Sequence, residues 1–155
     1  MKDLYNNILP VQLLAPVDKS TDTATPWYSK YVDLQGFEGC VIEVSVGVVT
    51  GGSSTDMLTF TIQEASTAPT TPASASSYAA AATTDLQGSF SVVYTGNNNA
   101  TLQRVGYKGS QRYICVKCVG TSTAGISADL ISITAILGIA AERPIIASPT
   151  TGSVS

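Results

Sequence analysis

The sequence predicts an all-β protein: an antiparallel β-sandwich or jelly-roll-like barrel of seven to eight short strands with extended N- and C-terminal arms. Two observations carry this prediction. Segments in which apolar and polar residues alternate recur along the chain, and a period of two residues is typical of half-buried strands. Gly-, Asn- and Ser-rich turn signals separate these segments every 8–14 residues or so, which is the spacing of sandwiches and barrels.

The composition fits one β domain and excludes several classes of protein. The chain has 155 residues, enough for one domain with its own core. Only 12% of the residues are charged, about half the usual fraction, and so weakly charged a surface suits a protein that is normally assembled. A net charge of −3 argues against a specific nucleic-acid partner for the whole molecule.

Three features bear on location. The opening residues 1–7 are not followed by the apolar stretch of a signal peptide. The longest apolar run, residues 133–141, is too short to span a membrane. The three cysteines are irregularly spaced, as expected in a reducing compartment. We therefore expect a protein made in a cytoplasm, with no membrane partner.

Residues 1–31 are predicted to form an N-terminal arm with an edge strand over residues 8–16. Pro10 and Pro16 interrupt this apolar stretch, and proline within a sheet is confined to edges, strand ends and bulges. Residues 19–25 are polar and loop-like, and the aromatic pair Trp27-Tyr28 follows.

The predicted β-sandwich domain covers residues 32–141. Residues 40–49 alternate, with the side chains at 40, 42, 44, 46 and 48 expected to point inward. Residues 57–64 alternate again, with the side chains at 58, 60 and 62 expected to point inward. The two segments are expected to form a hairpin or to lie near each other in one sheet. Further strands are expected at 88–94, 101–107, 112–119 and 126–137, and both faces of the last carry apolar residues.

Two segments are predicted to lie outside the sheets. Residues 65–84 form a low-complexity insert of Ala, Ser, Thr and Pro, which is expected to be a long surface loop. Residues 142–155 form a Ser-, Thr- and Pro-containing segment, which is expected to be a flexible C-terminal tail.

A short repeat lies within the predicted domain. Residues 33–36 and 85–88 both read Asp-Leu-Gln-Gly. The repeat fits either the two halves of a pseudo-symmetric sandwich or two unrelated turns with the same chemistry.

Catalytic equipment is sparse. The sequence contains no histidine, which removes imidazole acid–base chemistry and the commonest metal ligand. The carboxylates fall mostly in expected loops or on outward strand positions. We therefore predict that the protein is not an enzyme and that it uses no cofactor and no metal.

The segment Cys115-Val116-Lys117-Cys118 has the spacing of a CxxC motif. On a strand, however, residues three apart point to opposite faces, so the two thiols cannot share one metal ion or easily form a disulfide. These cysteines are predicted to be small buried apolar residues.

The most informative segment is basic and aromatic. Residues 103–113 contain three cations and two tyrosines, which fits a contact surface for an acidic partner. A solvated hairpin with an arginine over a tyrosine is an equal alternative, and single-stranded nucleic acid is a weaker one. The interface candidates across the chain are Tyr5, Trp27, Tyr28, Arg104, Tyr107, Lys108, Arg112 and Tyr113.

At this point the sequence resembles a known family. Residues 102–114, 32–37, 85–90 and 1–7 look like recognisable segments of small head proteins of tailed bacteriophages. The resemblance covers residues 1–137 discontinuously. The insert at 65–84 and the extension past Arg143 are longer than the family pattern.

The resemblance implies a capsid decoration, or cement, protein. Such a protein would be a homo-oligomer, with a trimer favoured, whose partner is the major capsid protein and whose place is the outer surface of the virion head, where it would stabilise contacts between capsomers. A head-completion, tail or fibre-associated subunit is the alternative, followed by a carbohydrate-binding β-sandwich with Trp27 and Tyr28 as its aromatic platform.

Overall fold

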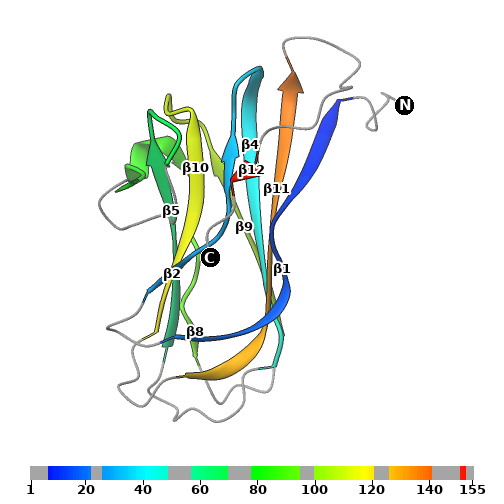
Figure 1. The fold of residues 1–155 in the computed structure, drawn as a ribbon, viewed down its shortest axis with the longest axis vertical. Coiled ribbons are helices and arrows are strands. Elements are labelled where there is room, and N and C mark those ends of the chain that lie inside the picture. Colours follow the sequence, from blue (N-terminus) through cyan, green and yellow to red (C-terminus); the bar gives the residue numbers. More distant parts are fainter. Residues whose placement is uncertain are drawn as a thin grey trace.

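The structure is a computed structural model that describes residues 7–21, 26–48, 57–69, 78–94, 100–120, 126–140 and 151–152. In these residues the chain forms two antiparallel sheets packed face to face (Figure 1). The predicted β-sandwich is therefore confirmed. The two sheets remain separate, so the alternative of a closed barrel is wrong.

Sheet I has the strand order β1-β11-β4-β9-β7. Its strands are β1 (Ile8–Thr21), β11 (Ile126–Ala140), β4 (Phe37–Val46), β9 (Thr101–Tyr107) and β7 (Leu86–Gln87). Sheet II has the order β12-β3-β10-β5-β6. Its strands are β12 (Thr151–Gly152), β3 (Tyr31–Asp33), β10 (Tyr113–Gly120), β5 (Met57–Ala65) and β6 (Ala79–Ala80).

Three short elements complete the description. The two-residue strand β2 (Trp27–Tyr28) pairs with β10, and β8 (Val93–Tyr94) pairs with β5. The 3-10 turn η1 (Thr83–Asp85) directly precedes β7.

Strand β1 belongs to the sandwich, although the sequence placed residues 1–31 in an arm. It pairs with β11 along nearly its whole length and forms the edge of sheet I. Its prolines suit that place, since Pro10 lies on the edge strand and Pro16 falls at a register shift between Leu14 and Val17. Leu13, at another register shift, is fully buried. The sandwich therefore begins before residue 32.

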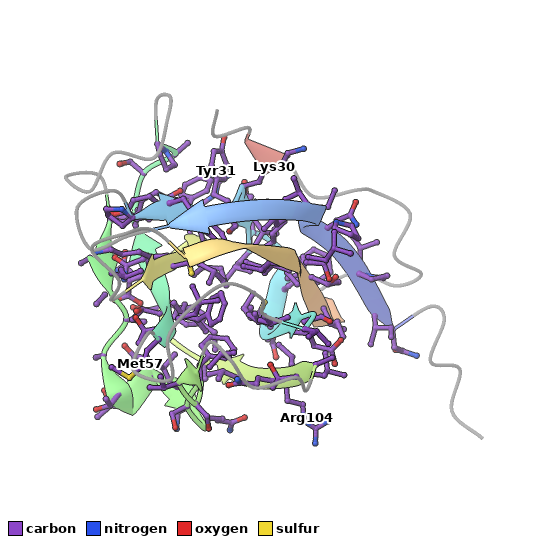
Figure 2. The ribbon with its side chains drawn as sticks, turned by 90° about the horizontal axis from the view of Figure 1, so that it is seen from below. Lys30, Tyr31, Met57 and Arg104 are labelled. Carbon is purple, nitrogen blue, oxygen red and sulfur yellow. The ribbon has the colours of Figure 1, made fainter. Side chains whose placement is uncertain are left out.

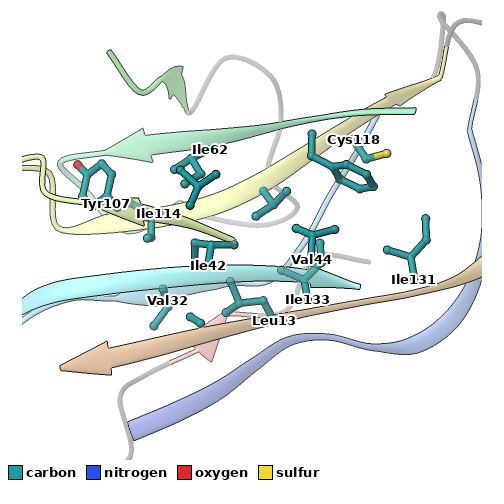
Figure 3. Packing of buried hydrophobic residues seen from close by; sticks show 14 of the residues in the cluster. Leu13, Val32, Ile42, Val44, Ile62, Tyr107, Ile114, Cys118, Ile131 and Ile133 are labelled. Atoms are coloured by element: carbon teal, nitrogen blue, oxygen red, sulfur yellow. The ribbon is translucent and has the colours of Figure 1, made fainter. Parts of the chain in front are cut away.

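The core lies between the two sheets and consists mainly of aliphatic side chains in alternate strand positions, together with Phe60 and Tyr107. Ile42 from β4 and Ile62 from β5 point into the same layer from opposite sheets (Figure 3). The side chains expected to point inward from residues 40–49 and 57–64 are buried, which confirms the prediction for all of them except Val48. Val48 is 45% exposed and lies beyond the end of β4. On β11 the buried residues are Ile131, Ile133, Ala135 and Leu137.

The expected pairing of residues 40–49 with 57–64 is wrong. Strand β4 pairs with β11 and β9 in sheet I, and β5 pairs with β10 in sheet II. Both segments bury one face against the other sheet, so their alternation is the same as that of a hairpin, and alternation alone does not distinguish the two arrangements.

The low-complexity insert is attached to sheet II near its C-terminal end. Ala79 and Ala80 pair with Glu64 and Gln63 of β5, and Tyr78 is only 8% exposed. Residues 70–77 of the predicted surface loop lie outside the described residues, as do residues 141–150 and 153–155 at the C-terminal end. Thr151 and Gly152, from the predicted tail, pair with β3.

The chain crosses from sheet I to sheet II at residues 108–112, which we call the corner. Strands β9 and β10 flank it but do not pair with each other, so this segment is no hairpin. The Tyr107 hydroxyl donates a hydrogen bond to Glu64 Oε2 at 2.7 Å and accepts one from the Gln111 N–H at 3.2 Å. One side chain thus joins β9, the corner and β5.

The two Asp-Leu-Gln-Gly segments hold the corner from either side. The Leu34 N–H donates to the Arg112 carbonyl, and the Lys108 N–H donates to the Asp85 carbonyl, each at 2.8 Å. Gly36 and Gly88 both have positive φ, at 87° and 91°, a conformation that glycine adopts without steric cost. The two copies of the repeat therefore share a glycine of positive φ and a backbone hydrogen bond to the corner, but Gln35 and Gly36 form a turn whereas Leu86 and Gln87 form β7.

Substitution of Gly109 tests how tightly the corner is packed. A Cβ atom there would lie 2.4 Å from the Tyr107 hydroxyl oxygen, so Gly109→Ala must displace the ring that joins the two sheets. We expect a loss of about 1–3 kcal/mol in the free energy of unfolding, measured by urea denaturation. Ser110→Ala, at the exposed neighbouring position, is the control and should change stability by less than about 0.5 kcal/mol. Equal stability of both variants would show that the corner is loosely packed.

Candidate interaction surface

The outer face of sheet II carries a cluster of tyrosines. Tyr113 and Cys115 of β10, Ala65 of β5 and Tyr78 form a second buried cluster, separate from the core, with Tyr28 and Tyr31 packed against it. Arg112 and Lys117 lie beside these rings. We call the set formed by Tyr28, Tyr31, Tyr78, Tyr113, Arg112 and Lys117 the tyrosine face.

Alternation along β10 creates this face. Ile114, Val116 and Cys118 point into the core between the sheets, so Tyr113, Cys115 and Lys117 point outward. The register places Lys117 opposite Tyr28 of β2 and Tyr113 opposite Asp33 of β3. Neighbouring strands thus bring together side chains that are far apart in the sequence.

The rings pack in two pairs. Tyr28 and Tyr78 are stacked, with ring centroids 6.3 Å apart and an interplanar angle of 16°. Tyr31 and Tyr113 meet edge to face at 5.6 Å and 89°. Both arrangements are favourable for aromatic pairs. Tyr78 and Tyr113 are buried beneath this surface, whereas Tyr28 and Tyr31 are half-buried and offer part of their rings to solvent.

Two cations flank the rings. The Lys117 ammonium lies 6.0 Å from the centroid of Tyr28, and the Arg112 guanidinium lies 5.0 Å from that of Tyr113. Arg112 is already neutralised, because it binds Asp33 through two hydrogen bonds of 2.8 and 2.7 Å. Lys117 has no carboxylate partner among the described residues. It therefore supplies the face with an uncompensated positive charge.

The hydroxyls of Tyr28 and Tyr78 and the thiol of Cys115 are neutral at physiological pH. Burial raises the pKa of Tyr28 and of Tyr78 above the ordinary tyrosine value. Burial likewise raises the pKa of the Cys115 thiol to about 12. The tyrosine face therefore offers neutral hydrogen-bonding groups and aromatic surface beside the Lys117 charge, and no reactive thiolate.

The prediction that the two cysteines of the CxxC segment are buried on opposite faces of a strand is confirmed. Cys115 lies in the tyrosine cluster, and Cys118 lies in the core on the other side of the sheet. Both are fully buried and free. Their alternation, which places the thiols on opposite faces, is that of any strand.

The Arg112–Asp33 ion pair fastens the edge of the tyrosine face to the corner. Asp33 also accepts a hydrogen bond from the Gln35 N–H at 2.9 Å, which fixes the turn after β3. The hydrogen bond from Arg112 is the main cause that lowers the pKa of Asp33 below its ordinary value. The pair thus closes a link between β3 and β10 where the chain enters sheet II.

A pocket of about 310 Å³ opens beside this ion pair. The turn after β3 supplies Gln35, β4 supplies Glu38, and the corner supplies Gln111 and Arg112, with Tyr107 behind them. The lining residues carry two side-chain amides, two hydroxyls, one carboxylate and a guanidinium that Asp33 already binds. No group of three or more metal-ligating side chains occurs among the residues that the structure describes.

The structure separates the candidates that the sequence grouped together. Tyr28, Arg112 and Tyr113 lie on the tyrosine face, although Tyr113 is only 8% exposed. Tyr107 is buried at the corner, and Trp27 packs against the core. Lys108 is exposed on the corner, and Arg104 is exposed on the outer face of sheet I (Figure 2). Tyr5 lies outside the described residues.

Three members of the tyrosine face were not singled out from the sequence. Lys117 shares the parity of Tyr113 and Cys115 on one strand, so alternation alone could have placed it there. Tyr31 lies two residues before Asp33 in β3, so alternation places both side chains on one face, although the strand is too short for this pattern to be clear. Tyr78 lies within the low-complexity insert, where no periodicity marks it.

No protein-family model matches the chain, and no curated protein matches it. No helix in the described part of the chain has the length and apolar character needed to cross a membrane.

The Arg112–Asp33 pair predicts a specific dependence of stability on pH. Arg112 lowers the pKa of Asp33 in the folded state, so the pair stabilises the protein above the unfolded pKa of aspartate, and this contribution disappears as the pH falls through the lowered folded-state pKa. Asp33→Asn should therefore lower the melting temperature at pH 7, and the difference from the wild type should shrink below about pH 4.

Thermal unfolding of both proteins between pH 7 and pH 2 measures this difference. Glu38→Gln is the control, because Glu38 is exposed and forms no ion pair among the described residues. A difference for Asp33→Asn that stays constant down to pH 2 would contradict a charge-based role for the pair.

Proposed function

We propose that this chain is a non-catalytic structural subunit of a tailed-phage particle, a decoration protein that binds the outer surface of the head through its tyrosine face. The tyrosine face is the observation that carries the proposal, and the sequence resemblance to small phage head proteins supplies the particle. The partner on this account is the major capsid protein.

The strand order supports the choice of a virion protein. The run β1-β11-β4-β9 in one sheet faces β3-β10-β5-β8 in the other. Taken in chain order, these strands follow the double Greek key of a jelly roll, an architecture found in viral capsid and lectin domains. Because one fold serves many functions, the fold alone does not identify the function, and the proposal also depends on the chemistry of the surface.

The chemistry of the tyrosine face suits a protein partner. Tyrosine and arginine are enriched at protein interfaces, because they combine a large apolar area with a polar end. The stacked and edge-to-face pairs hold these rings in place before binding, which lowers the entropy lost when a partner docks. The unpaired Lys117 charge favours a partner surface that presents carboxylates or carbonyl oxygens.

Surface buried between this protein and the capsomers would stabilise the head. A subunit that contacts two neighbouring capsomers adds interface that must be lost before the capsomers separate. Because binding only to the assembled shell stabilises that state by mass action, the decorated head should withstand higher internal pressure. No bond-making step is required of the chain.

One further candidate has a specific observation in its favour. The half-buried rings of Tyr28 and Tyr31 offer aromatic surface of the kind on which sugars stack, so a carbohydrate-binding sandwich is the second function to test. Trp27, the other half of the platform expected from the sequence, packs against the core instead. A head-completion, tail or fibre-associated role would use the same protein-binding chemistry at another place on the particle.

Charge and ring substitutions on the tyrosine face test the proposal. The wild-type protein should bind heads of the virus that encodes it, and Lys117→Glu or Tyr31→Ala should weaken that binding by about tenfold or more. Lys108→Glu, which makes the same charge change on the exposed corner, is the matched control and should bind like the wild type. Co-sedimentation of labelled protein with purified heads gives the affinities.

Heat release of packaged DNA gives the functional readout. Heads decorated with the wild type should release DNA at a higher temperature than bare heads, and heads incubated with Lys117→Glu should behave like bare heads. The proposal fails if the wild type does not bind heads. Binding at the tail would favour the tail-associated role, and binding to a glycan array that Tyr31→Ala abolishes would favour the carbohydrate role.

A further inference from the structure

The outer face of sheet I presents a second patch, on the strands β4 and β9. Ile42 and Val44 of β4 and Val105 of β9 point into the core, so Glu43, Ser45, Leu102 and Arg104 point outward. Leu102, the second residue of β9, is 71% exposed. We call these four outward residues the sheet I patch.

The register arranges the patch in two rows across the strands. Glu43 lies directly opposite Arg104, and Ser45 lies directly opposite Leu102. Glu43 and Arg104 do not form an ion pair, and the one ion pair found in the described residues joins Arg112 to Asp33. Arg104 instead points away from the molecule (Figure 2). Each row thus holds two unlike members: an acid beside a base, and a small residue beside a large one.

We propose that the sheet I patch is a dimer interface at which a second copy of this chain packs about a two-fold axis. The axis lies in the plane of the interface, runs parallel to the strands and passes between β4 and β9. Rotation about it exchanges β4 and β9 within each row. Glu43 of one copy then faces Arg104 of the other, and Leu102 of one copy faces Ser45 of the other.

The residues within each row are complementary to each other, and for this reason we infer that the partner is a second copy of the same chain. A two-fold contact must match a surface with itself, and most surfaces fail because like residues meet. Here both charges find opposite partners, and each exposed leucine meets a small side chain that leaves room for it. Rotation about such an axis packs the two sheets face to face with their strands nearly aligned, which is a common packing of β-sheets.

The dimer interface is independent of the proposed function, and it replaces the trimer that the sequence resemblance favours. The sheet I patch and the tyrosine face lie on opposite outer faces of the sandwich, so the dimer leaves both copies of the tyrosine face uncovered. The experiment uses the isolated full chain without particles. Failure to dimerise would therefore leave the head-binding proposal untouched, and failure to bind heads would leave the dimer untouched.

Sedimentation velocity of the wild type over about 1–500 μM should show a monomer–dimer equilibrium, the range in which moderate interfaces associate. Glu43→Arg and Arg104→Glu each create two like-charge contacts per dimer and should weaken association by about tenfold or more. The double variant, with the charges exchanged, should recover wild-type association. Thermal unfolding at a concentration below dimerisation reports separately on any loss of monomer stability from like charges on neighbouring strands.

Leu102→Ser and Leu130→Ser provide a matched pair. Both leucines are exposed, at 71% and 63%, but Leu130 lies on β11, farther from the proposed axis. Leu102→Ser should abolish the dimer, and Leu130→Ser should leave most of it. A monomer at all concentrations, a trimer, equal effects of the two leucine substitutions, or a charge-exchanged double variant that stays monomeric would each overturn the proposal.

Discussion

The hydroxyl of Tyr107 is the group on which the path of the chain between the two sheets depends. It joins β9 in sheet I to Glu64 of β5 in sheet II and also holds the backbone of Gln111 in the corner between them. The ring is buried, which raises the pKa of its hydroxyl and keeps it a hydrogen-bond donor. Since Gly109 leaves space for that hydroxyl and no more, the path of the corner is fixed by side-chain packing as well as by hydrogen bonds.

The corner also decides which surfaces the molecule presents. Because the chain changes sheets between Tyr107 and Tyr113, the basic segment that looks continuous in sequence is divided among separate places. Arg104 faces outward from sheet I, Lys108 stays on the corner, and Arg112 joins the tyrosine face. The protein therefore has two chemically distinct outer faces: an aromatic one with a net cation, and one on which Glu43 and Arg104 lie opposite each other on neighbouring strands.

Local pattern was sufficient to predict what a single strand does. Alternation identified the buried residues of β4 and β5 and placed Cys115 and Cys118 on opposite faces, because these follow from the two-residue period alone. Pairing between strands was harder. Residues 40–49 and 57–64 look like a hairpin, since a strand that buries one face against another sheet has the same alternation as one that pairs with its neighbour.

The candidate surface was predicted only in part for a related reason. Tyr28, Arg112 and Tyr113 were chosen for their chemistry, but their meeting with Tyr31, Tyr78 and Lys117 depends on the register of β10 with β2 and β3. Tyr107 carries the same chemistry and is instead buried in the corner. Residue type indicates which side chains can form an interface, whereas the crossing between sheets decides which of them reach the surface.

The most direct test of the central claim, that the tyrosine face contacts a phage head, is a density map of the mature particle in which this chain can be placed. We expect density for the sandwich on the outside of the head, with β10 turned toward the shell and Lys117 within reach of carboxylates or carbonyl groups of the major capsid protein. Density at the tail alone, or a sandwich on the head whose sheet II faces solvent, would contradict it.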